Sequence, residues 1–229
     1  MKKVIDVWLG KLVKEPDNYD YWALLSEDEK NKANAIRLAI LRAQYIEVRA
    51  KLRWVLANYI HVKPEQLIFA LGKHGKPYLP EYGHYHFNLS HSGDQLAIAV
   101  AQHCPVGIDV EQWKQKADYQ ALVKRCFAEE EQAYWRSLPD EHKKSEFYRF
   151  WTRKEAFVKA TGRGIGLGLD RCVILPQNPT EFLRVPSEYG SASDWEIYDL
   201  DFSEGSCGAL VAPACGFEVR IKQLNTCYQ

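Results

Sequence analysis

The stretch HFNLSHSGDQLAIAVAQHCPVGIDVE, residues 86–111, decides the fold. It contains three short runs of strand-forming residues, at 86–90, 95–101 and 106–110. The turn His91-Ser92-Gly93-Asp94 separates the first two runs, and a polar turn with glycine between two such runs is typical of a β-hairpin. The sequence therefore predicts a hairpin followed closely by a third strand.

Helical and strand-like patterns flank this stretch on both sides. Ser26 followed by Glu29 predicts a capping box at a helix start, and apolar residues recur at helical spacing over 36–59. The further elements that we expect are strands at 3–9, 67–71, 172–175, 195–201, 207–212 and 217–221, and helices at 120–128, 129–137 and 145–161. Because helices followed by strands occur twice, the sequence predicts an α/β (α+β) fold with an N-terminal lobe over 1–111 and a C-terminal lobe over 112–229.

The composition is that of an ordinary globular protein. The chain has 229 residues, with 30 Lys plus Arg against 30 Asp plus Glu. This balance argues against a general binder of nucleic acid or membranes, because a basic excess would show in the total. No apolar run approaches the ~18 residues of a membrane span, and the first ten residues do not resemble a signal peptide. The six cysteines include no C-x-x-C pair, so we expect free thiols and a cytoplasmic protein.

Asp109 and Glu111 occupy alternate positions of the third strand, so both side chains point to one side while Ile108 and Val110 point to the core. Two carboxylates so placed repel each other unless a positive charge lies between them. A hard cation such as Mg²⁺ fits, because it takes oxygen ligands from one or two carboxylates, waters and substrate phosphates. The alternative interpretation is a solvated strand edge.

A third carboxylate, Glu155, lies in the helical segment FWTRKEAFVK at 150–159, and its helical neighbours include Trp151 and Val158. Acids in such surroundings are rare unless they are paired or hold a metal. Lys159, one turn later, could pair with Glu155 or could reach a phosphate near the same ion.

Two polar segments are suited to holding phosphate. Hydrogen-bond donors gather at one strand end, on Ser90, His91 and Ser92. The alternative for His91 is a turn histidine whose ring is hydrogen-bonded to the backbone. In the loop 72–80, glycines allow the backbone to approach a ligand and Lys76 supplies a point charge. The alternative is an ordinary turn, in which the glycines serve only the backbone conformation.

Four motifs together resemble those of the Sfp-type 4′-phosphopantetheinyl transferases. They occur in the order of that family: Gly-Lys-Pro at 75–77, F-N-L-S-H-S at 87–92, G-I-D-V-E at 107–111 and F-W-T-R-K-E-A-F-V-K at 150–159. The resemblance implies a pseudo-dimeric fold of two similar lobes, a monomer, with coenzyme A in the cleft between the lobes.

The resemblance also implies roles for individual residues. Asp109, Glu111 and Glu155 would hold Mg²⁺ or Mn²⁺. Coenzyme A would be bound by Arg42, Lys76, Pro77, Ser90, His91, Lys154 and Lys159, with Arg42 taken from three candidate arginines, Arg42, Arg49 and Arg53, for the 3′-phosphate. Catalytic roles would fall to Glu131, Glu155 and Lys159. For Glu131, the alternative is one acid in a solvated run at 129–131.

The implied activity is transfer of 4′-phosphopantetheine from coenzyme A to a serine of an apo acyl or peptidyl carrier protein. The carrier would dock beside the second lobe, where a basic and aromatic stretch contains Trp113, Lys114, Lys116, Lys124, Arg125 and Phe127; a solvated helix face is the alternative. Two other functions stay open: a different Mg²⁺-dependent phosphotransferase or nuclease, and a non-catalytic coenzyme A- or carrier-binding protein of the same fold.

Overall fold

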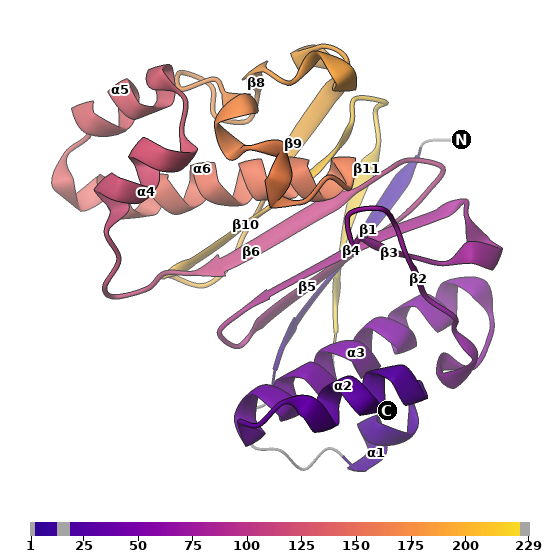
Figure 1. Ribbon diagram of the computed structural model, residues 1–229. Coiled ribbons are helices and arrows are strands. Elements are labelled where there is room, and N and C mark those ends of the chain that lie inside the picture. The colour runs from indigo at the N-terminus through magenta and orange to yellow at the C-terminus, as the bar shows by residue number, and fades with distance from the viewer. Residues whose placement is uncertain (1–2, 13–18, 225–229) are drawn as a thin grey trace.

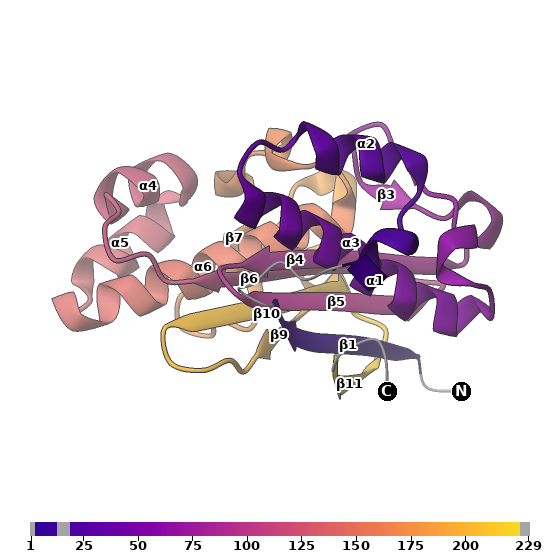
Figure 2. The same cartoon turned by 90° about the horizontal axis from the view of Figure 1, so that it is seen from below.

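The computed structural model describes residues 3–12 and 19–224 and shows a mixed α/β molecule with two lobes of helices and sheets (Figure 1). Two sheets lie face to face in the middle, and each has helices on its outer side. The helices are α1 (Tyr19–Ala23), α2 (Glu27–Ala35), α3 (Ala39–Ile60), α4 (Tyr119–Cys126), α5 (Glu129–Ser137) and α6 (Asp140–Thr161). Figure 2 shows α4 and α5 at one end of the molecule, beyond the strands.

The first sheet has the strand order β11-β1-β5-β4 and the second has the order β6-β10-β9. Their strands are β1 (Val4–Lys11), β4 (Tyr85–Ser92), β5 (Gln95–Gln102), β6 (Gly107–Gln112), β9 (Trp195–Leu200), β10 (Ser206–Pro213) and β11 (Glu218–Gln223). Two short two-stranded pairs complete the fold: β2 (Ala70–Leu71) with β3 (Pro77–Tyr78), and β7 (Val173–Ile174) with β8 (Phe182–Arg184).

Three apolar cores hold these layers together. The long helix α3 packs on the first sheet, where Leu52 and Leu56 meet Phe87 and Ile98. On the other side of this sheet, small residues such as Ala99 lie against the second sheet. The outer face of the second sheet is covered by α6 and its aromatic neighbours. Because β5 lies between two apolar layers, both of its faces are built from hydrophobic residues: Leu96, Ile98 and Val100 on one side and Ala97, Ala99 and Ala101 on the other.

Most expected elements are present, and the capping box of α2 is confirmed, with Ser26 Oγ accepting from Glu29 N and Glu29 accepting from Ser26 N. The expected strand at 67–71 is reduced to Ala70–Leu71, which follows a 3₁₀ turn at Pro64–Gln66. The helix α6 begins at Asp140 rather than at residue 145. Within the described chain, five cysteines are free, and Cys227 lies outside it.

The strand pairing differs from a division of the chain at residue 111. The strand β6 pairs with β10 in the second sheet, whereas β11, from the C-terminal part, pairs in parallel with β1 in the first. Two strands therefore cross that division, β6 into the second sheet and β11 into the first. Over residues 3–12 and 19–224, none of the helices combines the length and the apolar character needed to cross a membrane.

Gly107 allows α6 to lie directly on β6. A Cβ atom at this position would lie 1.9 Å from Ala156 O and 2.3 Å from Ala160 N, both on the backbone of the helix. Because backbone cannot move aside without displacing the helix, this contact requires glycine.

We therefore expect Gly107→Ala to lower the free energy of unfolding by at least about 2 kcal/mol, because the added methyl group overpacks the contact with α6. Urea unfolding followed by circular dichroism measures this change. Gly83→Ala is the matched control, since nothing lies within 4 Å of a Cβ there. Equal stability of the two variants would contradict the proposed close contact.

Candidate active site

The two sheets are joined by side-chain hydrogen bonds between β4 and β6, which lie side by side without pairing in one sheet. Alternate residues of β4 make these bonds: Asn88 Oδ1 accepts from Ile108 N, Ser90 Oγ donates to Asp109 Oδ1, and Ser92 Oγ donates to Glu111 Oε2, each at 2.8 Å. The period of two residues follows from the strand geometry. We call this set of contacts the β4–β6 seam.

Asp109 is the buried centre of the site, with 4% of its surface exposed. Lys159 Nζ lies 2.6 Å from Asp109 Oδ1 and also donates to Ser90 Oγ at 3.0 Å. Burial raises the pKa of Asp109 to about 6, although Lys159 acts in the opposite direction. Asp109 Oδ2 is buried and has no hydrogen-bond partner among the described residues. One oxygen of this carboxylate is therefore available to a further ligand.

Glu155 lies on α6, one turn before Lys159, and faces the same cluster. Burial raises the pKa of Glu155 to about 7, and the Asp109 and Glu111 carboxylates add to this rise. Ile108 and Val110, which alternate with the acids along the strand, are buried in the core. The three predicted acids are thus electrostatic neighbours. As placed, however, no group of three such side chains in the described chain is close enough to hold a metal ion.

Lys76 joins the glycine loop of the first lobe to the end of α6. Its Nζ donates to Lys159 O at 2.6 Å, to Val106 O at 2.9 Å and to Ala160 O at 3.4 Å. A cation at the C-terminal carbonyls of a helix is favoured by the helix dipole. Burial lowers the pKa of Lys76 to about 8. The expected phosphate ligand is therefore, in this structure, a fixed bridge between the loop and the helix.

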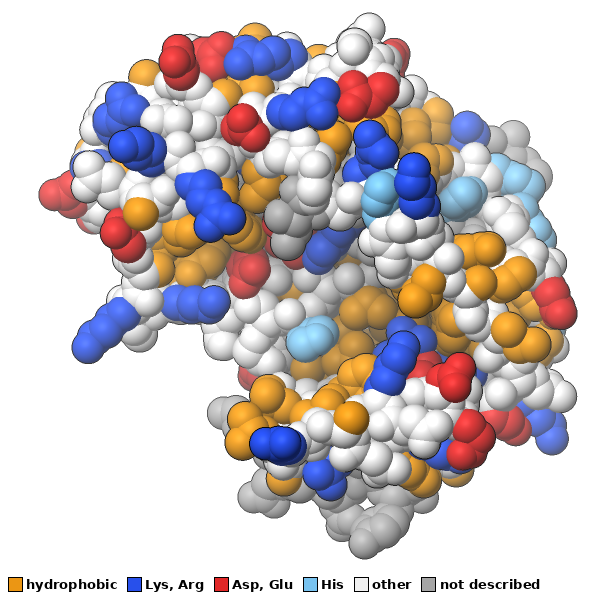
Figure 3. Space-filling model, viewed as in Figure 1, with side chains coloured by type: hydrophobic (Ala, Val, Ile, Leu, Met, Phe, Trp, Pro, Cys, Tyr) orange, Lys and Arg blue, Asp and Glu red, His pale blue; other side chains and the backbone are white. Residues whose placement is uncertain are grey.

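His91 lies on the exposed side of the site, at the end of β4. Partial desolvation and the neighbouring Lys159 ammonium lower the pKa of His91 below its ordinary value. The imidazole is therefore predominantly neutral at pH 7. Figure 3 shows this face of the molecule, where acidic, basic and histidine side chains lie in a hollow between the two lobes.

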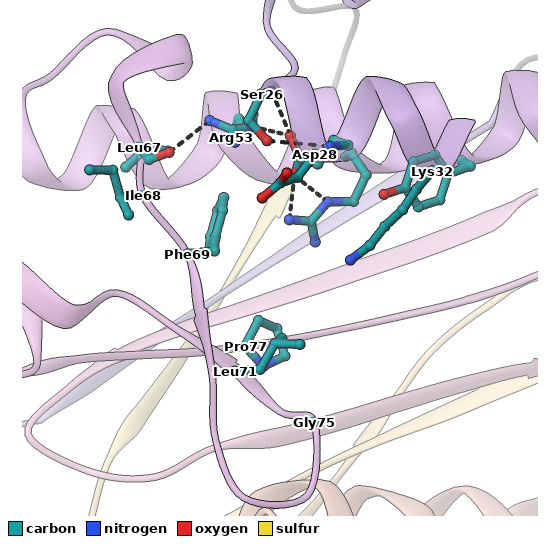
Figure 4. Close-up of a pocket in the computed structure, with 13 residues that line it drawn as sticks. Ser26, Asp28, Lys32, Arg53, Leu67, Ile68, Phe69, Leu71, Gly75 and Pro77 are labelled. Carbon is teal, nitrogen blue, oxygen red and sulfur yellow. Dashed lines mark hydrogen bonds and ion pairs between the residues drawn. The ribbon is translucent and has the colours of Figure 1, made fainter. Parts of the chain in front are cut away.

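A cavity of about 470 Å³ opens between α2, α3 and the β2–β3 segment (Figure 4). One wall is formed by Phe69, Leu71 and Pro77, and the other by residues of the two helices, including Lys32 and Tyr45. Figure 4 shows Gly75 on the loop that continues from this wall. The cavity therefore leads into the loop that carries Lys76.

The three candidate arginines have different environments. Arg42 donates through Nε and Nη2 to Ile36 O, at 3.0 and 2.9 Å, and so joins the end of α2 to α3. Arg49 and Arg53 line the cavity but are ion-paired with Glu29, at 2.5 and 2.6 Å. Burial alone would raise the pKa of Glu29, but the two guanidinium groups and its backbone hydrogen bond lower it. Arg42 is not among the residues that line the cavity.

Glu131 and Lys154 bind each other inside the second lobe, at 2.7 Å, and both side chains are fully buried. Glu131 also accepts from Ala128 N and Ile174 N, and Lys154 Nζ donates to Leu169 O and Cys172 O. These contacts fasten α5 and α6 to the loop that precedes β7. Glu131, expected as a base, and Lys154, expected to bind coenzyme A, therefore do not reach the surface of the hollow.

Two parts of the site escaped the sequence analysis. The sequence pattern gives no sign of the role of Asn88, whose Oδ1 accepts from Ile108 N and so aligns the seam. Lys32 forms no ion pair with any residue that the structure describes and lies at the cavity. Lys32 lies four residues after Asp28, so the two share one face of the helix that begins after Ser26. The sequence does not indicate whether that face meets a ligand or solvent.

Comparison with known proteins places this arrangement in a family. The model of the 4′-phosphopantetheinyl transferase superfamily matches residues 105–212. The 4′-phosphopantetheinyl transferase HetI of Nostoc sp. is 38% identical over 85% of this chain and 81% of its own length. The 4′-phosphopantetheinyl transferase psf-1 of Bacillus pumilus is 33% identical over 86% and 83%, and Sfp of Bacillus subtilis is 25% identical over 87% and 88%.

The chain therefore belongs to the Sfp-type 4′-phosphopantetheinyl transferase family, a family of enzymes.

The buried pair of Glu131 and Lys154 predicts a loss of stability when one partner is removed. Glu131→Gln leaves a buried ammonium without its counter-ion, and we expect a loss of roughly 3–5 kcal/mol in the free energy of unfolding. The neighbouring acid, Glu130, provides the control, because its ion pair with Arg184 has a similar length of 2.6 Å but is exposed. We expect little change for Glu130→Gln. Urea unfolding of both variants tests this; equal midpoints would show that burial of the pair is unimportant.

Proposed function

We propose that this protein transfers the 4′-phosphopantetheine group of coenzyme A to a serine of an apo carrier protein, releasing adenosine 3′,5′-bisphosphate. The observation that carries the proposal is the cluster of Asp109, Glu111, Glu155 and Lys159 at the β4–β6 seam, in a chain of this transferase family. Such a cluster is suited to phosphoryl transfer, in which a protein mainly positions the reactants and neutralises charge.

The cavity between α2 and α3 would hold the adenosine end of coenzyme A. Phe69 on one wall and Tyr45 on the other are suited to an adenine base, and Lys32 supplies a positive charge not neutralised by an ion pair with any described residue. We assign Lys32 rather than Arg42 to the 3′-phosphate, because the Arg42 guanidinium is bound to Ile36 O. The pyrophosphate would then follow the loop at 75–77 toward His91, Ser90 and Lys159.

A divalent cation fits the chemistry of the acids. The donor set consists of carboxylate oxygens, which Mg²⁺ and Mn²⁺ prefer, and Asp109 Oδ2 is buried without a partner. We propose that Asp109, Glu111 and Glu155 hold one Mg²⁺ or Mn²⁺, which when bound supplies positive charge against the pyrophosphate oxygens. The electrostatics of Glu155 support this proposal: burial raises its pKa to about 7, and repulsion from the Asp109 and Glu111 carboxylates adds to the rise, although Lys159 acts in the opposite direction.

The residues of the chain can then perform the transfer as follows. The carrier serine attacks the β-phosphorus of coenzyme A, and its oxygen forms the new P–O bond as the bond to adenosine bisphosphate breaks. Lys159 offsets charge on the phosphates from its position beside Asp109 and Ser90. The neutral imidazole of His91, on the exposed side of the site, is the group placed to take the serine proton.

Glu131 and Lys154 receive a structural role in this proposal, because both are fully buried and bound to each other. Lys76 would position the end of α6 as well as attract phosphate. Each lobe contains one sheet covered by a helix of 22 residues, α3 or α6. This similarity supports a pseudo-dimeric arrangement that forms the whole site within one chain, as expected of a monomer.

Mass spectrometry of an apo acyl or peptidyl carrier incubated with the protein, coenzyme A and Mg²⁺ tests the function. We expect the carrier to gain the mass of one phosphopantetheine, and EDTA to abolish the gain. Glu155→Gln removes a charged ligand and is expected to lower the rate more than about 100-fold. Glu141→Gln, exposed on the same helix, is the control. Coenzyme A binding without modification of any carrier would instead support a non-catalytic binding protein.

Metal affinity is expected to increase with pH. Protons compete with a cation for the oxygens of Asp109 and Glu155, whose pKa values are raised to about 6 and about 7. Raising the pH through these values removes the competing protons, so affinity should increase by more than about tenfold between pH 6 and pH 8 and then level off. Calorimetric titration with Mg²⁺ or Mn²⁺ measures this without turnover. An affinity independent of pH over this range would contradict the assignment of these ligands.

A further inference from the structure

Three hydrophobic side chains are exposed at the start of α3. Leu38, Ile40 and Leu41 expose 63%, 44% and 49% of their surfaces, and we call them the α3 patch. Leu38 also occupies the N-cap position and provides no side-chain hydrogen bond to the first turn. Leucine is disfavoured at an N-cap, where Ser, Thr, Asp or Asn would stabilise the helix. The patch therefore contributes neither to the core nor to the capping of its own helix.

The α3 patch borders the proposed coenzyme A site. Leu41 and Tyr45 are four residues apart and so share one face of the helix, and Tyr45 lines the cavity. The exposed face of the patch thus continues along α3 into the cavity. In Figure 3, hydrophobic side chains gather at the lower border of the hollow, over the α2 and α3 region.

The opposite border of the hollow is basic. Lys114, Lys116, Lys124 and Arg125 are exposed between the end of β6 and the end of α4, and none of them forms an ion pair with a residue in the described ranges. Figure 3 shows Lys and Arg side chains over this link, across the hollow from the hydrophobic border. An acidic surface next to an apolar one on a single partner would complement both borders at once.

We infer that the α3 patch is the first lobe's half of the docking surface for the carrier protein. This inference rests on the proposed function. The carrier serine must reach the acids of the β4–β6 seam, so the carrier has to cover the hollow and contact its borders. Apolar side chains beside the serine would pack on Leu38 and Leu41, while acidic side chains would meet the cations on the opposite border. Clustered exposed hydrophobic residues commonly mark such protein interfaces.

The test is the double variant Leu38→Ser/Leu41→Gln. Serine at the N-cap favours the helix and glutamine is a good helix former, so α3 should be retained. We expect the KM for the carrier to rise about tenfold, as for loss of buried apolar contacts at an interface. The dissociation constant of coenzyme A and the kcat at saturating carrier should change less than about twofold, because the site chemistry is untouched.

Ile221→Gln is the matched control, because Ile221 is 45% exposed on β11, within the first sheet and outside the patch. It should leave every constant unchanged. An unaltered carrier KM in the double variant, with an active wild type, would overturn the docking surface and leave the transferase activity standing. Wild-type protein that modifies no carrier would overturn both. A dimer that the double variant disperses, with carrier KM unaltered, would assign the patch to a second copy of this chain instead.

Discussion

The hydrogen bonds between alternate side chains of β4 and β6 are the contacts on which the rest of the molecule depends. Both strands are edges of their own sheets, so their backbones do not complete a common ladder. Asn88, Ser90 and Ser92 replace that ladder with side-chain bonds of 2.8 Å. Because two of these bonds end on Asp109 and Glu111, the contacts that join the lobes also fix the carboxylates of the site. A change that separates the sheets would therefore disperse the acids.

Close approach of the layers makes this arrangement possible and also makes it electrostatically costly. Alanines such as Ala99 on one sheet and Gly107 on the other permit the sheets and α6 to come together, which buries Asp109 to 4% exposure. Buried acids favour the protonated form, and the raised pKa values of Asp109 and Glu155 reflect this. Lys159 offsets part of the repulsion, and a divalent cation would offset more. Added positive charge would therefore stabilise the ionised form of these acids.

The sequence predicted those features that depend on local pattern. Alternation placed Asp109 and Glu111 together, and the Ser26 and Glu29 pair marked the start of α2. The pairing of β11 with β1 could not be predicted from the sequence. It joins the two ends of the described chain, and no local spacing encodes it. The burial of Glu131 was also missed. Its run at 129–131 looks solvated, since its counter-ion, Lys154, lies on another helix.

Lys76 connects the loop at the cavity to the helix that carries part of the acidic cluster. Its ammonium group donates to Val106 O, Lys159 O and Ala160 O, so all of its protons are directed at backbone of the second lobe. The same loop places Gly75 and Pro77 at the cavity. Since the last turn of α6 carries Lys159, any shift of the loop would be transmitted to the residue that contacts Asp109. Lys76 is therefore the direct link between the loop at the cavity and the helix end beside the acids.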